Sequence, residues 1–250
     1  MLSIKKLNKK YGDKIILNNI NLDIPNNKFV SVIGPNGAGK STLLSAITQL
    51  TEYDGTVIID GSNIRSYTRK DIAKKISYLK QSNEINIKIT VRDLIGFGRY
   101  PYSNGNLTEE DNRVIDKVIK NMELEDIQDK YINQISGGEK QRSLIAVSLA
   151  QDSKYILLDE PLNNLDIKHS VQIMQILNSI INTTDKTVIA IIHDLNFVSK
   201  YSDFIIGIKK GNILFARNKE YVMNANLLNT LYDYNINIEK IGNQYLCNYF

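Results

Sequence analysis

Eight consecutive residues have the types and spacing of a phosphate-binding loop: Gly34, Pro35, Asn36, Gly37, Ala38, Gly39, Lys40 and Ser41. They fit G-x-x-x-x-G-K-[ST] and lie between the apolar stretch FVSVI and a segment with helical periodicity. Glycines let the backbone wrap around phosphate oxygens, and the N–H groups that open a helix attract anions. We expect Lys40 to reach the β and γ phosphates of a nucleoside triphosphate and Ser41 to ligate Mg²⁺, with Thr42 in the same site.

Two further apolar stretches end in residues that suit phosphate chemistry. YILLDE ends in Asp159 and Glu160, and TVIAIIH ends in His193, one of 2 histidines in the chain. Buried parallel strands would bring all three to one edge of a sheet. We expect Asp159 to hold Mg²⁺, Glu160 to orient or deprotonate the attacking water, and His193 to contact the γ-phosphate. The alternatives are an acidic turn after a core strand and a structural histidine; His169 has no assigned role.

Gln81 and Tyr11 are weaker candidates for the same site. Gln81 follows the apolar stretch ISYLK, where its amide could contact Mg²⁺ or the attacking water. Tyr11 offers a flat ring on which adenine could stack. A polar strand end explains Gln81 equally well, and most of the 14 tyrosines must serve packing or the surface.

A second anion-binding turn is suggested by Ser136, Gly137, Gly138 and Glu139. The pattern S-x-x-E is also a capping box, which begins a helix without any ligand. The turn precedes a segment in which we expect one apolar face, formed by Leu144, Val147 and Leu149.

The elements that would position these residues alternate between strands and helices. Strands are expected at residues 3–7, 14–24, 29–33, 56–61, 75–81, 155–160 and 187–193, and two more at 204–216 around a turn at 210–212. Helices are expected after the phosphate-binding loop and at residues 90–97, 108–122 and about 169–182. In the helix at 108–122, Thr108 and Asp111 form a capping box. Its apolar face is formed by Val114, Ile115, Val118, Ile119 and Met122.

The overall composition is that of a soluble globular protein. The 250 residues are 42% hydrophobic and 23% charged, with a net charge of +4, which gives no nucleic-acid signal. No apolar run approaches the ~20 residues of a membrane-spanning helix. The single cysteine, Cys247, cannot form an internal disulfide.

In this order, the motifs GPNGAGKS, a Gln before a helical insertion, ISGGEKQR, YILLDEP, NNLD and a strand-end His resemble those of the ATP-binding subunit of an ABC transporter. The resemblance implies an α/β fold: a P-loop NTPase core with an N-terminal antiparallel β subdomain and an inserted all-helical subdomain. As one domain of residues 1–250, it would divide into β subdomain and core (1–81 and 154–217), helical subdomain (82–153) and a C-terminal tail (218–250).

The same resemblance implies why one chain has two phosphate-binding turns. In that family the turn of Ser136, Gly137, Gly138 and Glu139 binds the γ-phosphate of ATP held by a second copy, in a head-to-tail dimer. Asp166 matches the loop that crosses the dimer interface. By position, Tyr11 is the adenine platform, Gln81 the coupling glutamine, Glu160 the catalytic carboxylate and His193 the switch histidine. Mg²⁺ would be held by Ser41, Gln81 and Asp159.

The stretch VRDLIGFGRYPY, followed by LTEED, is similar to ATPases of iron–siderophore, heme and cobalamin importers, with the siderophore branch favoured. This implies a membrane permease that contacts residues 82–105, an extracytoplasmic siderophore-binding protein, and a location at the cytoplasmic face of the membrane. Two residues depart from the family pattern: Glu139, where Gln is usual, and Leu162, where Thr is commoner. ABC ATPases that act on ribosomes or DNA, and small-molecule kinases, are the rival classes.

Overall fold

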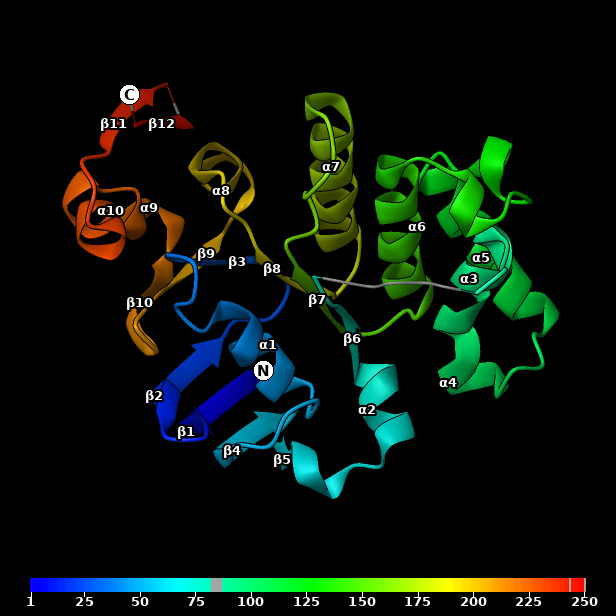
Figure 1. Cartoon of the computed structure of the whole chain (residues 1–250), viewed down its shortest axis with the longest axis horizontal. Coiled ribbons are helices and arrows are strands. Elements are labelled where there is room, and N and C mark those ends of the chain that lie inside the picture. Colours follow the sequence, from blue (N-terminus) through cyan, green and yellow to red (C-terminus); the bar gives the residue numbers. More distant parts are fainter. Residues whose placement is uncertain (82–86, 243, 250) are drawn as a thin grey trace. The chain divides into compact units, whose positions relative to one another are not determined.

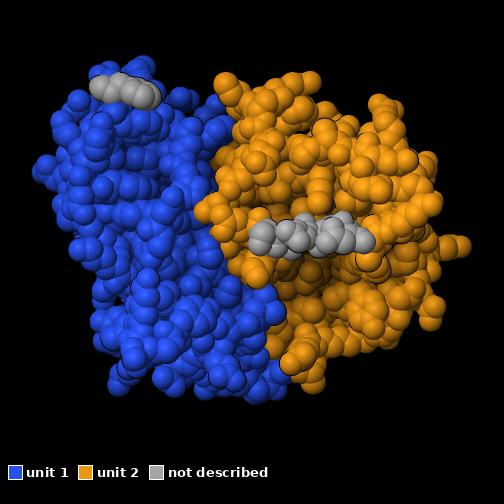
Figure 2. Space-filling model, in the orientation of Figure 1, with its two compact units in different colours: residues 1–67, 187–250 blue, residues 68–186 orange. Residues whose placement is uncertain are grey.

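The chain folds into two compact units in the computed structural model, which describes residues 1–81, 87–242 and 244–249. Unit 1 comprises Met1–Tyr67 with Thr187–Phe250, and unit 2 comprises Thr68–Lys186 (Figure 2). Residues 82–86, with which the predicted helical insertion and the predicted permease contact begin, lie outside the described residues. Unit 2 is larger than the predicted insertion because it also includes the strands and helices that flank it.

An antiparallel sheet opens unit 1, with the strand order β2-β1-β4-β5 (Figure 1). From Ile20 to Ile24 the side chains of β2 alternate between buried and exposed, because successive side chains of a strand point to opposite faces. The strands are β1 (Leu2–Tyr11), β2 (Lys14–Ile24), β4 (Asp54–Ile59) and β5 (Ser62–Asn63).

A second group of strands in unit 1 leads into the phosphate-binding loop. β3 pairs in parallel with β8 on one side and with β9 on the other, and β10 pairs antiparallel with β9. Every residue of β3 and of β8 is buried, which is typical of parallel strands with both faces covered. The bounds are β3 (Phe29–Ile33), β8 (Thr187–Ile191), β9 (Phe204–Lys209) and β10 (Asn212–Asn218).

Along the chain, the helices of unit 1 come after strands β3, β5, β8 and β10. The segment predicted as a C-terminal tail contains regular secondary structure. This segment forms two helices and an antiparallel hairpin, whose second strand packs on α8 (Figure 1). The elements are α1 (Lys40–Ile47), the 3₁₀ turn Ile64–Ser66, α8 (Leu195–Tyr201), α9 (Lys219–Val222), α10 (Ala225–Tyr232), β11 (Asn237–Ile241) and β12 (Gln244–Asn248).

Unit 2 combines a pair of parallel strands with a group of helices. Strand β6 pairs with β7, and α3 and α5 pack against α6. None of the helices in the described parts of the chain has both the length and the apolar character to cross a membrane. The elements are α2 (Arg69–Lys75), β6 (Ile76–Leu79), α3 (Val91–Gly96), α4 (Tyr100–Ser103), α5 (Glu109–Asn121), α6 (Gly137–Ala150), β7 (Tyr155–Asp159), α7 (Ile167–Thr183) and the 3₁₀ turns Phe97–Arg99, Glu125–Ile127 and Ile132–Gln134.

The stretch that carries the resemblance to siderophore ATPases also holds the helices of unit 2 together. Arg99 Nε donates to Asp111 Oδ1 at 2.8 Å, and both side chains are less than a tenth exposed. The Arg99 guanidinium also donates to the carbonyl of Ala150 in α6 and lies 4.1 Å from the centre of the Tyr102 ring. A hydrogen bond from the Thr108 backbone, assisted by Arg99, lowers the pKa of Asp111.

Most of the predicted elements are present, with shifts at their ends. The strands at 14–24 and 29–33 and the Thr108–Asp111 capping box are confirmed. Four predicted strands extend too far: β4 ends at Ile59 rather than Gly61, β6 at Leu79 rather than Gln81, β7 at Asp159 rather than Glu160, and β8 at Ile191 rather than His193. Helices α2 and α10 and the hairpin β11–β12 were not predicted.

The predicted buried face of the helix after the second turn is wrong. Leu144, Val147 and Leu149 are only half-buried in α6, and the fully buried positions are Ser143, Ile145, Ala146, Ser148 and Ala150. The reason is close packing: α3, α5, β6 and β7 all contact this helix. A helix covered on several sides needs small residues where its neighbours approach. A single apolar stripe in its sequence then does not predict which residues are buried.

Candidate functional site

The phosphate-binding loop joins β3 to α1 in unit 1, and its backbone requires glycine at two positions. Gly34 has φ of 145°, and a Cβ there would lie 2.1 Å from the carbonyl oxygen of Ile208 in β9. Gly39, the residue before α1, has φ of 105°, and a Cβ would lie 2.9 Å from the carbonyl oxygen of Ile16. Other residues would strain both conformations and collide with the backbone.

Lys40 lies inside the loop, although its side chain is charged. It is 6% exposed, and its Nζ donates to the carbonyl oxygens of Gly34 at 2.8 Å and Pro35 at 2.9 Å. Helix α1 begins here without a side-chain cap, so its first N–H groups are not satisfied by a capping side chain. A buried ammonium and an uncapped helix start both favour an anionic ligand, and Ser41 and Thr42 lie in the same first turn.

The turn between β9 and β10 braces the loop. Gly211 N–H donates to the Ala38 carbonyl at 3.0 Å, and the Gly211 carbonyl accepts from Asn18 N–H at 2.9 Å. A Cβ at Gly211 would lie 2.4 Å from the Ile16 carbonyl oxygen, so the turn must come this close. Three elements therefore hold the loop in place: the strand before it, the helix after it, and a hairpin more than 170 residues further along the chain.

Tyr11 ends β1 and is 55% exposed. The Lys9 ammonium lies 4.6 Å from the centre of its ring, and its hydroxyl lies 3.5 Å from Thr51 Oγ1. An adenine would stack on the opposite face of the ring or displace Lys9. In the same unit, His193 lies between the end of β8 and the start of α8, with its side chain exposed.

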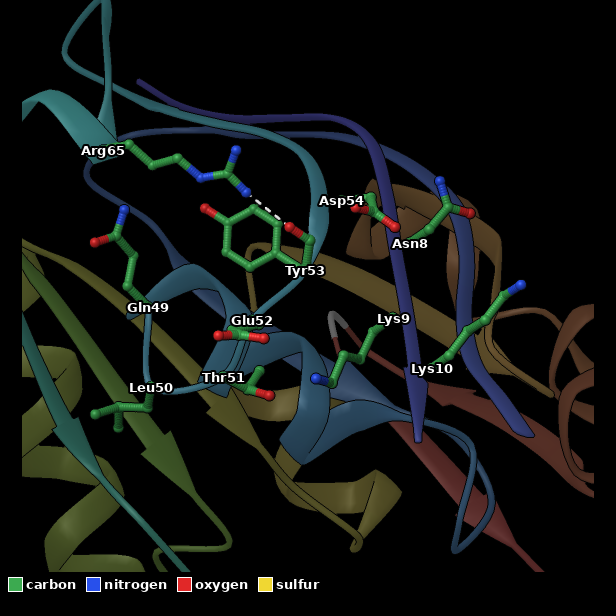
Figure 3. A pocket seen from close by; sticks show the side chains of 10 residues that line it. All are labelled: Asn8, Lys9, Lys10, Gln49, Leu50, Thr51, Glu52, Tyr53, Asp54 and Arg65. Carbon is green, nitrogen blue, oxygen red and sulfur yellow. Dashed lines mark hydrogen bonds between the residues drawn. The ribbon is translucent and has the colours of Figure 1, made fainter. Parts of the chain in front are cut away.

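A polar cavity of about 630 Å³ lies beside the end of β1. Figure 3 shows Arg65 reaching across it to the Tyr53 carbonyl, which accepts a hydrogen bond at 2.7 Å. The predicted site residues are all described by the structure, and none of them lines this cavity. It is lined by Asn8, Lys9, Lys10, Gln49, Leu50, Thr51, Glu52, Tyr53, Asp54 and Arg65.

In unit 2, β7 places two carboxylates in different surroundings. Asp159 is 1% exposed, and its Oδ2 accepts from the Tyr78 hydroxyl at 3.2 Å. Glu160 is half-buried and has φ of 54°, a left-handed conformation that is costly for a residue with a side chain. Its Oε2 accepts from Gln81 Nε2 at 2.7 Å and from Asn163 Nδ2 at 2.5 Å. The strained backbone and the two amide donors fix the direction of this side chain.

In the second predicted turn, Ser136 and Glu139 form a complete capping box at the start of α6 in unit 2. Ser136 Oγ accepts from Glu139 N–H at 3.3 Å, and Glu139 Oε2 accepts from Ser136 N–H at 2.8 Å. The hydrogen bonds from Ser136, the backbone one first, lower the pKa of Glu139. The turn is also open: Ser136 and Gly137 are exposed, and a Cβ on Gly137 would meet nothing within 4 Å. The capping box thus coexists with a helix start that an anion can approach.

The loop after Glu160 lies against this turn. A Cβ on Gly138 would lie 3.5 Å from the Leu165 side chain, and Gln141 Nε2 donates to the Pro161 carbonyl at 3.1 Å. Asp166 caps α7 by accepting from His169 N–H at 2.8 Å, and the same oxygen lies 2.8 Å from His169 Nδ1. These contacts, with the His169 backbone first, lower the pKa of Asp166.

The two predicted phosphate-binding turns belong to different units. Tyr11, the loop at 34–42 and His193 are in unit 1, whereas Gln81, residues 136–139, Asp159, Glu160 and Asp166 are in unit 2. Within unit 2 the structure joins Gln81 to Glu160, and residues 136–139 to the loop of Asp166. Sequence reasoning missed Asn163 and His169. Their signal was their place three residues after Glu160 and Asp166, the spacing of local side-chain hydrogen bonds.

Comparisons with known proteins show the family and the fold of this chain. The ABC transporter family matches residues 17–163. The petrobactin import ATP-binding protein YclP of Bacillus subtilis is 48% identical over 251 residues, covering 100% of both chains. The petrobactin import ATP-binding protein FatE of Bacillus anthracis is 41% identical, covering 96% of both. The ATP-binding cassette MJ0796, solved as a dimer bound to ADP and Pi, is 32% identical with a TM-score of 0.79, covering 88% of this chain and 99% of that one.

The resemblance, the fold class and the hydrolysis of ATP predicted from the sequence are thereby confirmed. The chain belongs to the ABC transporter family, as an ATP-binding and ATP-hydrolysing subunit.

Proposed function

We propose that this protein powers the import of a ferric siderophore of the petrobactin type through a membrane permease, at the cytoplasmic face of the membrane. The similarity to two petrobactin import ATP-binding proteins over nearly the whole of each chain supports this class of cargo. An extracytoplasmic siderophore-binding protein would deliver the iron complex. Since cargo recognition then lies in other subunits, the role of this chain is to convert ATP hydrolysis into movement.

The observation that supports an ATPase working as two copies is the open helix start at Ser136. Loop 34–41 already offers a buried lysine and an uncapped helix start, while Ser136 lies at the exposed start of another helix, in unit 2. The working enzyme is a head-to-tail dimer of two copies, with each ATP held between Lys40 of one protomer and Ser136 of the partner subunit. Asp166 lies in the loop assigned to this interface, and the next residue, Ile167, is 83% exposed, as an apolar residue awaiting a partner surface would be.

The residues present also fit Mg²⁺, which prefers oxygen ligands. Ser41, Gln81 and Asp159 would hold it, and it would neutralise negative charge on the phosphates. The Gln81 amide nitrogen donates to Glu160, which leaves its carbonyl oxygen as the atom type that suits a metal. Asp159 is fixed by Tyr78 at the end of β7.

Hydrolysis follows from the roles of the remaining side chains. A water oxygen attacks the γ-phosphorus in line with the bond to the β–γ bridging oxygen, which breaks and leaves ADP. Glu160 orients this water and accepts its proton, and the amides of Gln81 and Asn163 hold the carboxylate in place. Lys40 and His193 stabilise charge on the γ-phosphoryl group as the bond breaks. Loss of the γ-phosphate removes the ligand of Ser136 of the partner subunit, so the dimer opens and the permease changes state.

Uptake measurements test the proposed cargo. In a strain that lacks the gene, the wild-type chain restores uptake of labelled ferric petrobactin, whereas Glu160→Gln at equal expression does not. Uptake of ferric hydroxamate, heme and cobalamin, each measured separately, tests whether the chain serves one of the other importer classes. If the chain restored uptake of heme or cobalamin but not of petrobactin, the proposed cargo would be wrong, while the role as an importer ATPase would stand. Co-purification with ribosomes rather than with a permease would overturn the transport function itself.

A further inference from the structure

The described part of the C-terminal segment, residues 218–242 and 244–249, packs on α8, the helix that begins two residues after His193. Strand β12 lies beside α8 (Figure 1). Three hydrogen bonds made by side chains of α8 join the two elements. Asn196 Oδ1 accepts from Cys247 N–H at 2.8 Å, and Asn196 Nδ2 donates to the Cys247 carbonyl at 3.3 Å. Ser199 Oγ donates to the Tyr245 carbonyl at 2.7 Å. The first turn of α8 is therefore fixed from the end of the chain.

Tyr249 adds a hydrogen bond to Asp194, the residue directly after His193. Its hydroxyl donates to Asp194 Oδ1 at 3.4 Å and accepts from Asn196 Nδ2 at 3.3 Å. Asp194 is the N-cap of α8 and accepts from Asn196 N–H at 2.7 Å, so one carboxylate serves both the cap and the tyrosine. Burial, with the nearby Asp194 carboxylate, raises the pKa of Tyr249 to about 12, which keeps the donor proton on its hydroxyl.

The same segment reaches the phosphate-binding loop. Tyr232, the last residue of α10, lies near enough to the backbone of Gly34, where the loop begins, for that backbone to act on the pKa of its hydroxyl. A mostly apolar cavity of about 260 Å³ separates this contact from the His193 turn. Its lining residues are His193, Leu195, Tyr232, Tyr234, Ile236 and Tyr249. Tyrosines of the C-terminal segment thus contact both parts of unit 1 that face the γ-phosphate in the proposed mechanism.

We propose that Tyr249 is a positioning residue for hydrolysis: through Asp194 and Asn196 it holds the turn that presents His193 to the γ-phosphate. This rests on the role given to His193 under the proposed function. The side chain of His193 is exposed and lies between a buried strand and a helix start, so its direction depends on how that turn is fixed. Small displacements of a group that acts on the transition state lower the rate strongly.

The competing interpretation is that β12 only covers α8 and contributes to stability. Tyr249→Phe separates the two, because it removes the hydroxyl and keeps the ring. Tyr221→Phe is the matched control, since Tyr221 is 67% exposed on α9. A purely structural role would change the melting temperature and leave turnover per folded molecule unchanged.

Steady-state ATP hydrolysis is the first measurement. We expect Tyr249→Phe to lower kcat about fivefold with KM for ATP unchanged, the effect of one lost hydrogen bond on the transition state. Tyr221→Phe matches the wild type. Unchanged kcat in Tyr249→Phe, with His193→Ala strongly impaired, would overturn the positioning role while leaving His193 in place. Full activity in His193→Ala would instead remove the role of His193 on which the inference rests.

The imidazole NMR signals give a readout that does not depend on activity. The chain has 2 histidines, so His169 in unit 2 serves as an internal reference for His193. Tyr249→Phe should shift or broaden the His193 ring signals and leave those of His169 unchanged. His193 signals identical to those of the wild type would contradict the proposal even if turnover had fallen.

Discussion

At the residue scale, the chemistry of unit 2 depends on side chains that hold one another in position. The Glu160 carboxylate accepts from amides of Gln81 and Asn163, and its left-handed backbone turns the chain directly after β7. Asp159, its neighbour, is buried and bound by Tyr78. In the proposed mechanism Glu160 acts on water and Asp159 on a metal ion, and the structure gives the two carboxylates different surroundings.

Substitutions of Ser136 test whether this residue only caps α6 or also binds an anion. Ser136→Asp keeps a good N-cap for α6 but places a negative charge where the γ-phosphate of the partner's ATP should bind. We expect a melting temperature near that of the wild type and loss of ATP turnover by at least 100-fold, about 3 kcal/mol or more of repulsion and lost binding. Ser136→Arg should also stop turnover while ATP binding by the monomer is retained. Near wild-type turnover in Ser136→Asp would mean that the cap is the only function of this serine.

At the element scale, close approach of backbones decides how the helices of unit 2 pack. Gly98 lies against α6, where a Cβ would come within 2.4 Å of the Val147 carbonyl oxygen and 3.0 Å of the Ala150 Cβ. The adjacent Arg99 then reaches both Asp111 and the Ala150 carbonyl. The stretch that indicates the siderophore branch therefore has a structural task as well as a family resemblance.

Gly98→Ala and Gly96→Ala form a matched pair in this stretch. At Gly96 the added methyl would meet Leu107 at 3.5 Å and Ile115 at 3.8 Å, which are ordinary contacts. We expect Gly98→Ala to lower the free energy of unfolding by about 1–3 kcal/mol through overpacking. Gly96→Ala should be neutral or stabilising by up to about 1 kcal/mol, because alanine favours the helix. Urea denaturation of both variants measures this, and equal stabilities would contradict the packing argument.

The C-terminal segment should give a stability change at alkaline pH. Burial raises the pKa of Tyr232 from 10.0 to about 12. Between these values the folded chain keeps the proton and the unfolded chain loses it, so the stabilisation is complete below pH 10 and is lost as pH rises towards 12. The contribution of Tyr232 is roughly 3 kcal/mol at most. Denaturation curves should fall more steeply with pH in the wild type than in Tyr232→Phe. Tyr221→Phe should retain the wild-type slope, and an unchanged slope in Tyr232→Phe would contradict the assignment.

At the scale of the whole molecule, one chain carries two predicted phosphate-binding turns. Loop 34–41 belongs to unit 1, and the turn at 136–139 belongs to unit 2. In the proposed dimer each nucleotide uses one turn from each protomer. ATP binding and association are then the same event, and hydrolysis reverses it.

Glu160→Gln tests this coupling. The variant should bind ATP without hydrolysing it, so with ATP and Mg²⁺ its mass in solution should approach that of two chains. With ADP it should remain a monomer. Adding Lys40→Ala, which weakens ATP binding, or Ser136→Asp should restore the monomer in each case. Light scattering measures the mass; a Glu160→Gln chain that stays monomeric with bound ATP would contradict the head-to-tail dimer.

The sequence by itself determined the features that depend on neighbouring residues. The loop at 34–41, the buried strand at 29–33, the buried strand predicted at 155–160 (observed to end at Asp159), and the capping boxes at Thr108 and Ser136 follow from patterns a few residues long. Local patterns suffice for these because the backbone conformation they require is set within one turn or one strand.

Only the tertiary structure decided which distant residues meet. Gln81 and Glu160 are 79 residues apart, and Tyr249 and Asp194 are 55 apart, yet each pair shares a hydrogen bond. The buried side of α6 was likewise set by the elements packed around it, against the pattern of its own sequence. Such contacts depend on how whole elements pack, since side-chain burial and hydrogen-bond partners come from neighbours that no local window contains.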